Sequence, residues 1–191
     1  ALKAGFQVNT HAIGDRANRV VLDELATALD AVPVADHRFR IEHAQILHPD
    51  DIARFAELGV IPSMQASHQT SDMYWAGARI GPTRELGAYA WRSLLDSGVI
   101  IPNGSDLPVE LPDPLISFHA AVSRQDAKDW PAGGWHPEQR MSREEALRSM
   151  TILRGRPFTS RVRAKNLVAA VLLRRFDSMK SRVLPSLSTA R

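Results

Sequence analysis

The chain has 191 residues, 44% hydrophobic and 24% charged, a composition typical of a globular protein that can bury one sizeable core. It contains no cysteine, which excludes disulfide bonds and thiolate metal ligands and leaves histidine and carboxylate as the strong metal ligands. No apolar run approaches the roughly 18–20 residues that a membrane-spanning helix needs, and no leader of charged and then apolar residues is visible. The cytoplasm is the default expectation for such a protein.

The net charge of +3 is distributed unevenly. Residues 1–151 carry 14 Lys and Arg against 20 Asp and Glu, whereas residues 152–191 carry 10 against a single acid, Asp177. This change predicts a body, residues 1–151, and a basic tail, residues 152–191. Two origins of the tail stay open, an out-of-frame or unrelated segment and a divergent native one. Nucleic-acid binding by the tail ranks last, because no aromatic residues are interleaved with its basic ones.

Strand-like and helix-like patterns alternate along the body. The short β-favouring runs are residues 6–11, 39–44, 60–65 and 99–106. The segments with apolar residues at helical spacing are residues 15–32, 48–59, 83–98, 113–124 and 142–151. The polar stretch 66–83 is expected to be a long loop. Alternating strands and helices predict βαβ units and a parallel sheet, so the expected fold class is α/β.

Local signals refine two of these helices. Asp15 is the expected N-cap of the helix over 15–32, and Val20 and Leu25 are expected in its apolar stripe. Ser142 and Glu145 have the spacing of a capping box at the start of the last helix.

Three of the expected strands end in groups that bind metals. His11 ends the first, His43 the second and Asp106 the fourth. Imidazole and carboxylate ligands suit zinc or a similar divalent ion in hydrolytic chemistry, and active sites of parallel α/β folds lie at the carboxyl ends of strands. A single histidine near a strand end is more often a structural residue. Three such positions together favour a site.

The segments "NTHAIGDRANRVVLDEL", "RIEHAQILHPDDIARFAELGVIPSMQASH" and "IPNGSDLPVELPDPL" carry a resemblance to a known family. In order and spacing they resemble the amidohydrolase superfamily, specifically its YtcJ-like branch (amidohydrolase family 3), over residues 1 to about 151. The resemblance implies a partial (β/α)8 TIM barrel: strands 5–8 with their helices, without strands 1–4 and most of the small β domain. It also implies a metal-dependent hydrolase of non-peptide carbon–nitrogen bonds, often in amides or N-substituted formamides.

Residue roles follow from the same resemblance. His11 and His43 correspond to metal ligands at the ends of strands five and six, and Asp106 to the aspartate of strand eight, which contacts the metal and takes a proton from the attacking water. Ser63 and Gln65 would face the substrate from strand seven, and His68 would lie in the loop over the pocket. The implied cofactor is a divalent metal, zinc above all, with one or two ions in the complete enzyme.

The family also places an HxH pair on strand one and a carboxylated Lys or a Glu on strand four, and neither is in this sequence. Because these ligands are missing, we expect self-association or pairing with an N-terminal half. The resemblance implies a small-molecule amide-type substrate, and we expect no membrane partner. The alternative is a non-catalytic fragment or pseudoenzyme that binds a partner chain.

Overall fold

A computed structural model describes residues 1–151 of the chain, and the predictions for the tail, residues 152–191, lie outside the described residues. Three strands, β1 (Asn9–Ala12), β2 (Arg40–His43) and β3 (Ile61–Ser63), form a parallel sheet in the order β1-β2-β3. Ala12 pairs with His43 and Glu42 pairs with Ser63, so the carboxyl ends of the strands meet at one edge. The α/β class is confirmed for this part of the chain.

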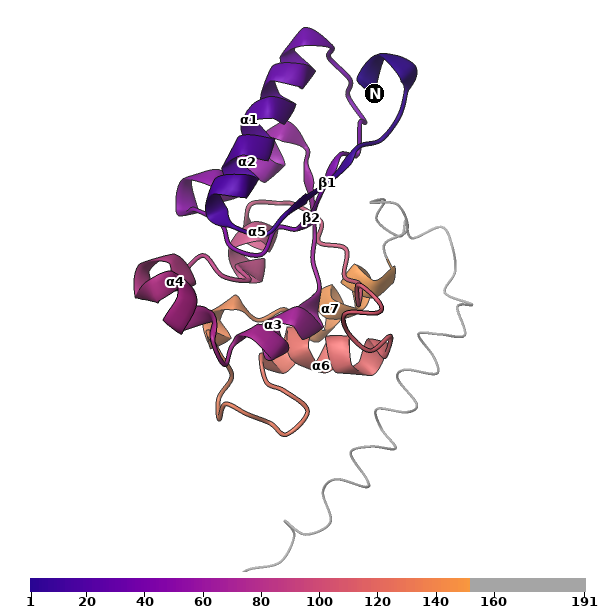
Figure 1. Ribbon diagram of the computed structural model, residues 1–191. Coiled ribbons are helices and arrows are strands. Elements are labelled where there is room, and N and C mark those ends of the chain that lie inside the picture. The colour runs from indigo at the N-terminus through magenta and orange to yellow at the C-terminus, as the bar shows by residue number, and fades with distance from the viewer. Residues whose placement is uncertain (152–191) are drawn as a thin grey trace, which may run out of the picture. The chain divides into compact units, whose positions relative to one another are not determined.

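Two helices connect these strands and pack against each other, α1 (Asp15–Ala31) and α2 (Pro49–Leu58) (Figure 1). Leu22 and Phe55 are fully buried, in one core with Ile41 of β2. The sequence explains the bounds of α2: the His48 side chain accepts from the amide of Asp50 at its start, Pro49 suits the first turn, and Gly59 ends the helix at φ 65°.

Two expectations for α1 are wrong. Gly14, not Asp15, is the N-cap, because the Asp15 carboxylate pairs instead with Arg84, 2.8 Å away, far along the chain. Val20 is 50% exposed, and the buried stripe contains Asn18, Leu22 and Leu25. The Asn18 amide is buried because it donates to four backbone carbonyls, among them those of Ala12 and Ile46.

The expected loop over 66–83 is also wrong, since it contains helix α3 (Ala66–Asp72) and most of α4 (Ala76–Glu85). Helix α3 lacks a cap of its own, and the side-chain oxygen of Asn103 accepts from the Ala66 amide at 2.9 Å instead. A distant residue thus starts this helix, which local polarity could not indicate.

The expected helix over 83–98 is broken in two. Helix α4 ends at Glu85, and α5 runs over Trp91–Asp96. Between them Gly87 lies so close to Leu47 that an added Cβ would come within 1.9 Å of the Leu47 carbonyl oxygen, while the Leu47 amide donates to the Gly87 carbonyl at 2.9 Å. This close backbone contact replaces the helical turn.

The expected strand over 99–106 is reduced to an isolated parallel bridge between Met64 and Asn103. The Met64 amide donates to the Pro102 carbonyl at 2.9 Å, and the Gly104 amide donates to the Met64 carbonyl at 3.1 Å. Pro102 has no amide hydrogen to extend the ladder. The segment still runs beside the end of β3, which places Asp106 near the carboxyl edge of the sheet.

The remaining elements follow expectation more closely. The elements that complete the described part are η1 (Leu2–Ala4), α6 (Pro114–Ser123), η2 (Pro137–Gln139) and α7 (Arg143–Thr151). The capping box is confirmed: the Ser142 amide donates to Glu145 Oε2 at 2.7 Å, and the Glu145 amide donates to Ser142 Oγ at 3.2 Å. Helix α6 contacts both α3 and α7. Among residues 1–151, no helix has both the length and the apolar character that crossing a bilayer requires.

Candidate metal centre

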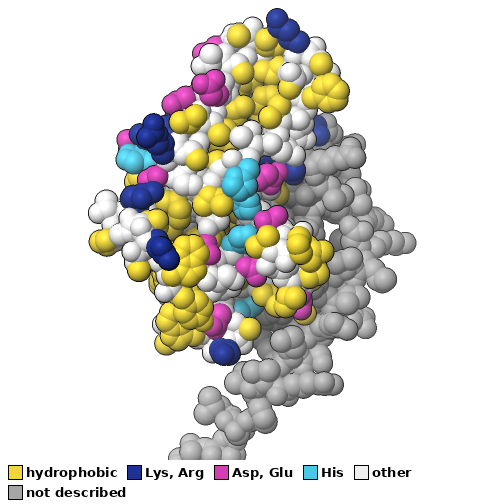
Figure 2. All heavy atoms as spheres, viewed as in Figure 1, with side chains coloured by type: hydrophobic (Ala, Val, Ile, Leu, Met, Phe, Trp, Pro, Cys, Tyr) yellow, Lys and Arg dark blue, Asp and Glu magenta, His cyan; other side chains and the backbone are white. Residues whose placement is uncertain are grey.

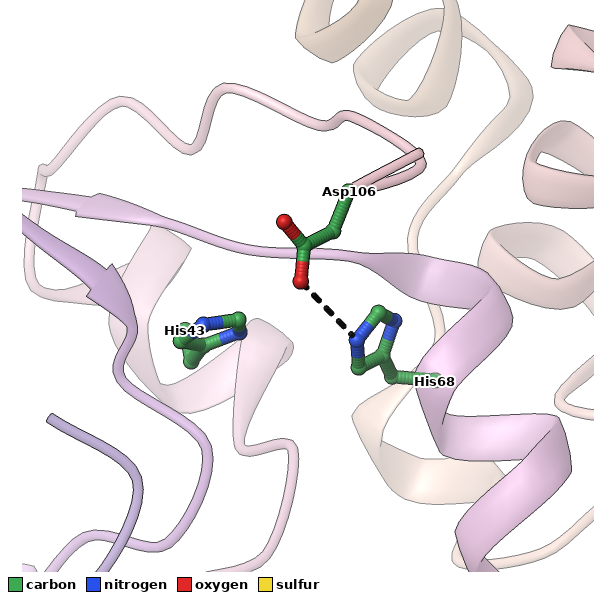
Figure 3. A group of neighbouring side chains, drawn as sticks. All are labelled: His43, His68 and Asp106. Carbon is green, nitrogen blue, oxygen red and sulfur yellow. Dashed lines mark ion pairs between the residues drawn. The ribbon is translucent and has the colours of Figure 1, made fainter. Parts of the chain in front are cut away.

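Three side chains from different elements converge at the carboxyl edge of the sheet (Figure 3). His43 ends β2, His68 lies in the first turn of α3, and Asp106 follows the bridge to Met64. One ligand atom of each lies within 4.8 Å of the others. His68 Nε2 and Asp106 Oδ2 are 3.6 Å apart. Two imidazole nitrogens and a carboxylate oxygen form a donor set that fits a divalent metal ion such as zinc.

His43 is oriented by a buried contact. Its Nδ1 lies 2.8 Å from Oε1 of Gln65, and both residues are buried. Because Nδ1 is engaged there, Nε2 is the nitrogen left for a ligand. A ring nitrogen of His43 faces the side of the cluster where His68 and Asp106 lie (Figure 3).

His68 lies in a half-buried position between acidic groups. Burial lowers its pKa, which favours the neutral imidazole that a metal needs, while the Glu110 carboxylate, with Oε1 4.0 Å from Nδ1, opposes this shift. Nδ1 is buried without a hydrogen-bond partner, and Nε2 faces Asp106. The ring therefore has one nitrogen directed into the cluster.

The backbone is strained at two of the three positions. His43 has φ 76° and Asp106 has φ 54°, and Ala44 next to His43 has φ 45°. Residues with a Cβ rarely adopt this left-handed region, and such strain gathers at functional sites. This backbone conformation accompanies the placement of these side chains in the cluster. The strain supports a functional role for the cluster.

The other residues singled out in the sequence lie close by. The His11 ring packs edge-on against His43, with ring centroids 4.6 Å apart, but His11 is not one of the three residues whose ligand atoms lie within 4.8 Å. Ser63 is buried, and its carbonyl accepts from Gln65 Nε2 at 3.4 Å. His68, expected in a loop, lies on a helix and contributes to the cluster itself.

Three residues that the sequence did not single out brace the site. Asp72 Oδ2 accepts from Gln45 Nε2 and from the Tyr89 hydroxyl, both at 2.5 Å. Gln45 lies two residues after His43, and Asp72 lies one helical turn after His68, so this network joins the elements that carry the two histidines. Burial raises the pKa of Asp72, and the bond from Tyr89 opposes that shift. The spacing of His68 and Asp72 would have been a signal only if α3 had been recognised as a helix.

The surface around the centre is mixed in character. Figure 2 shows histidine side chains in the middle of this face, acidic side chains beside them and apolar side chains to either side. Leu107, Val109 and Leu111, in the segment after Asp106, are 63–69% exposed. The centre thus lies next to apolar surface.

Comparison with known proteins places this chain in a family. The family model described as "Amidohydrolase family" matches residues 1–154. Protein LONG AFTER FAR-RED 3 of Arabidopsis thaliana is 39% identical over 155 residues, which cover 81% of this chain and 26% of that protein. The N-substituted formamide deformylase of Arthrobacter pascens is 30% identical over 156 residues, covering 80% of this chain and 28% of the enzyme.

A solved structure agrees with the sequence relatives. The crystal structure of an uncharacterized metal-dependent hydrolase from Pyrococcus furiosus matches with a TM-score of 0.62 and 35% identity, over 76% of this chain and 28% of that one. The chain therefore belongs to the amidohydrolase family, as its motifs predicted. It spans about a quarter of the length of the relatives that it matches.

Proposed function

We propose that this chain forms part of the active site of a metal-dependent hydrolase that cleaves carbon–nitrogen bonds other than peptide bonds. The observation that carries the proposal is the convergence of His43, His68 and Asp106 at the carboxyl edge of a parallel sheet, in a chain of the amidohydrolase family. The name of the Arthrobacter pascens relative makes N-substituted formamides the first substrates to test.

The proposed architecture is a section of a (β/α)8 barrel. Three consecutive parallel strands with helical connections form one part of it, and the segment bridged to Met64 takes the place of a further strand. Barrel enzymes assemble their sites from the carboxyl ends of several strands, which is the edge where the three side chains lie. The similarity to a metal-dependent hydrolase of known structure supports this proposal.

We assign the metal to His43, His68 and Asp106, with zinc as the ion and His11 as a further ligand. His43 would bind through Nε2, since Nδ1 is engaged by Gln65. The His11 ring already packs against that of His43. When bound, a divalent ion polarises a substrate carbonyl and lowers the pKa of water toward ~7.

The residues of the chain then handle the proton. The Asp106 side chain is 42% exposed, so one of its oxygens can accept a proton from a water molecule and return it to the leaving amine nitrogen. His68 Nε2 and Asp106 Oδ2 lie 3.6 Å apart, so a metal ion held by both would also keep that carboxylate in place. Of the expected contacts on the substrate side, Ser63 remains our proposal, whereas Gln65 acts on His43 and His68 belongs to the proposed metal ligands.

The substrate proposed is a small amide with an apolar substituent on nitrogen. The exposed side chains of Leu107, Val109 and Leu111 follow Asp106 directly and provide the apolar surface that such a substituent would contact. A charged substituent would gain nothing from this surface.

The first test is metal binding by the full chain. Isothermal titration with zinc should show binding that is weakened in His43→Ala, His68→Ala and Asp106→Ala by more than the roughly 10–100-fold that a lost supporting contact costs. The matched control is His119→Ala, because His119 lies on α6 and bonds the Asp126 carbonyl. Absence of zinc binding to the wild-type chain, or equal losses in the control, would overturn the metal assignment.

The second test is activity. We expect zinc-dependent hydrolysis of an N-substituted formamide when the chain is mixed with the N-terminal part of a longer family member, and none with Asp106→Ala. β1 pairs only with β2 among residues 1–151, so its other edge is open to a partner strand. This open edge also favours the second candidate, a non-catalytic chain that binds a partner. A complex that forms but hydrolyses nothing with any divalent metal would select that candidate.

A further inference from the structure

Gln65 makes a buried hydrogen-bond contact with His43, one of the proposed metal ligands. Its Oε1 lies 2.8 Å from His43 Nδ1, and the two residues are 7% and 8% exposed. Inside a protein such a bond is stronger than in water.

The orientation of the Gln65 amide follows from its second contact. Its Nε2 donates to the Ser63 carbonyl at 3.4 Å, which directs Oε1 toward His43. A rotated amide would place two oxygens, those of Gln65 and Ser63, against each other. Because Oε1 can only accept, a neutral His43 must provide the hydrogen from Nδ1.

We propose that Gln65 is a positioning residue that holds the proton of neutral His43 on Nδ1 and leaves Nε2 unprotonated toward His68 and Asp106. A neutral imidazole free in water carries its proton mainly on Nε2. That tautomer would block the nitrogen with which His43 would bind a metal. The hydrogen bond made by one ring nitrogen sets the state of the other. Gln65 thus prepares His43 for a ligand before any metal arrives. The value of this role for metal binding rests on the proposed function, whereas the position of the proton does not.

Nuclear magnetic resonance tests the proton position in the metal-free protein. Long-range proton–nitrogen correlation of histidine rings, in alkaline buffer that keeps them neutral, distinguishes a protonated nitrogen from a bare one. We expect His43 to show a protonated Nδ1 and a bare Nε2 in the wild type. In Gln65→Met the acceptor is gone, and both nitrogens should move to the intermediate shifts of a mixture. A wild-type His43 protonated on Nε2 would overturn the proposal, even if no variant folds.

Two further variants separate this role from simple packing. Gln65→Glu keeps an acceptor toward His43 and should keep the proton on Nδ1, because whichever oxygen faces the Ser63 carbonyl, the other still accepts from His43. Gln69→Met is the matched control, because Gln69 is a fully buried glutamine whose amide contacts Met73. An unchanged His43 spectrum in Gln65→Met, or an equal change in Gln69→Met, would contradict the proposal.

Zinc titration completes the test. Affinity should fall about 10–100-fold in Gln65→Met and recover in Gln65→Glu, as for other residues that orient metal ligands. If the wild type binds no zinc but His43 is protonated on Nδ1, the proposed function fails and the role of Gln65 in tautomer choice stands. If zinc binds but the position of the His43 proton does not depend on Gln65, the role of Gln65 in tautomer choice fails and the proposed function stands.

Discussion

Residues 9–63, the strand–helix segment, are held by strand ladders and apolar packing, whereas residues 64–111, the site segment, combine apolar packing with side chains that bond to distant parts of the chain. In the strand–helix segment, β1, β2 and β3 pair in continuous register, and Leu22 and Phe55 are fully buried. In the site segment, Asn103 caps α3 from 37 residues away and Asp72 joins Gln45 to Tyr89.

The difference separates two kinds of contact. Buried apolar side chains stabilise both segments, and the bonds that only the site segment makes fix where His68 and Asp106 lie relative to His43. Truncating a packed apolar side chain should therefore lower the free energy of unfolding most, and removing one of these bonds should change the metal centre at a smaller cost in stability.

The largest expected effect is that of Phe55→Ala. Phe55 of α2 is fully buried in the core cluster that contains Ile41, so its truncation should lower the free energy of unfolding by about 3–5 kcal/mol. Urea denaturation followed by circular dichroism measures this loss. Val20→Ala is the control in the same segment, since Val20 is 50% exposed and should change stability by less than about 0.5 kcal/mol. Equal losses in both variants would contradict the burial on which the comparison depends.

Asp72→Ala should have the next largest effect. It removes the acceptor of the buried Tyr89 hydroxyl, and an unpaired buried donor costs about 1–3 kcal/mol. Asp72→Asn keeps an acceptor oxygen and should cost much less. Zinc affinity should fall in Asp72→Ala, because the bond that joins Asp72 to Gln45 braces the two histidine-bearing elements. A stability loss with unchanged zinc affinity would show that the network does not position the site.

Comparing the wild type with Asp72→Asn also tests a dependence of stability on pH. Burial raises the pKa of Asp72 above 3.8, so the folded protein holds this proton more tightly than the unfolded chain. This contribution to stability is present at low pH and is lost as the pH rises through the folded pKa. The difference in free energy of unfolding between the wild type and Asp72→Asn should therefore shift against the wild type as the pH increases. An opposite slope would mean that the bonds to Asp72 outweigh its burial.

The two segments also differ in how far the sequence could predict them. The strands and helices of the strand–helix segment follow from local spacing, and the stop at Gly59 and the cap at His48 are local as well. The start of α3 depends on Asn103 and the break before α5 on the contact of Gly87 with Leu47, and no local pattern indicates either. His43 and Asp106 could be predicted from their places after strands, but the place of His68 in the cluster required α3.

The smallest effect, and the most specific to the site, concerns the backbone at Asp106. Asp106 has φ 54°, a conformation that glycine adopts without strain and alanine does not. Asp106→Gly should therefore be more stable to urea than Asp106→Ala by about 1 kcal/mol, although both remove the ligand. Glu24, inside α1, provides the control. There the glycine variant should be less stable than the alanine variant by a similar amount, because glycine weakens a helix interior. If glycine were the less stable variant at both positions, Asp106 would not be strained, and the left-handed backbone would lose its force as support for a functional site.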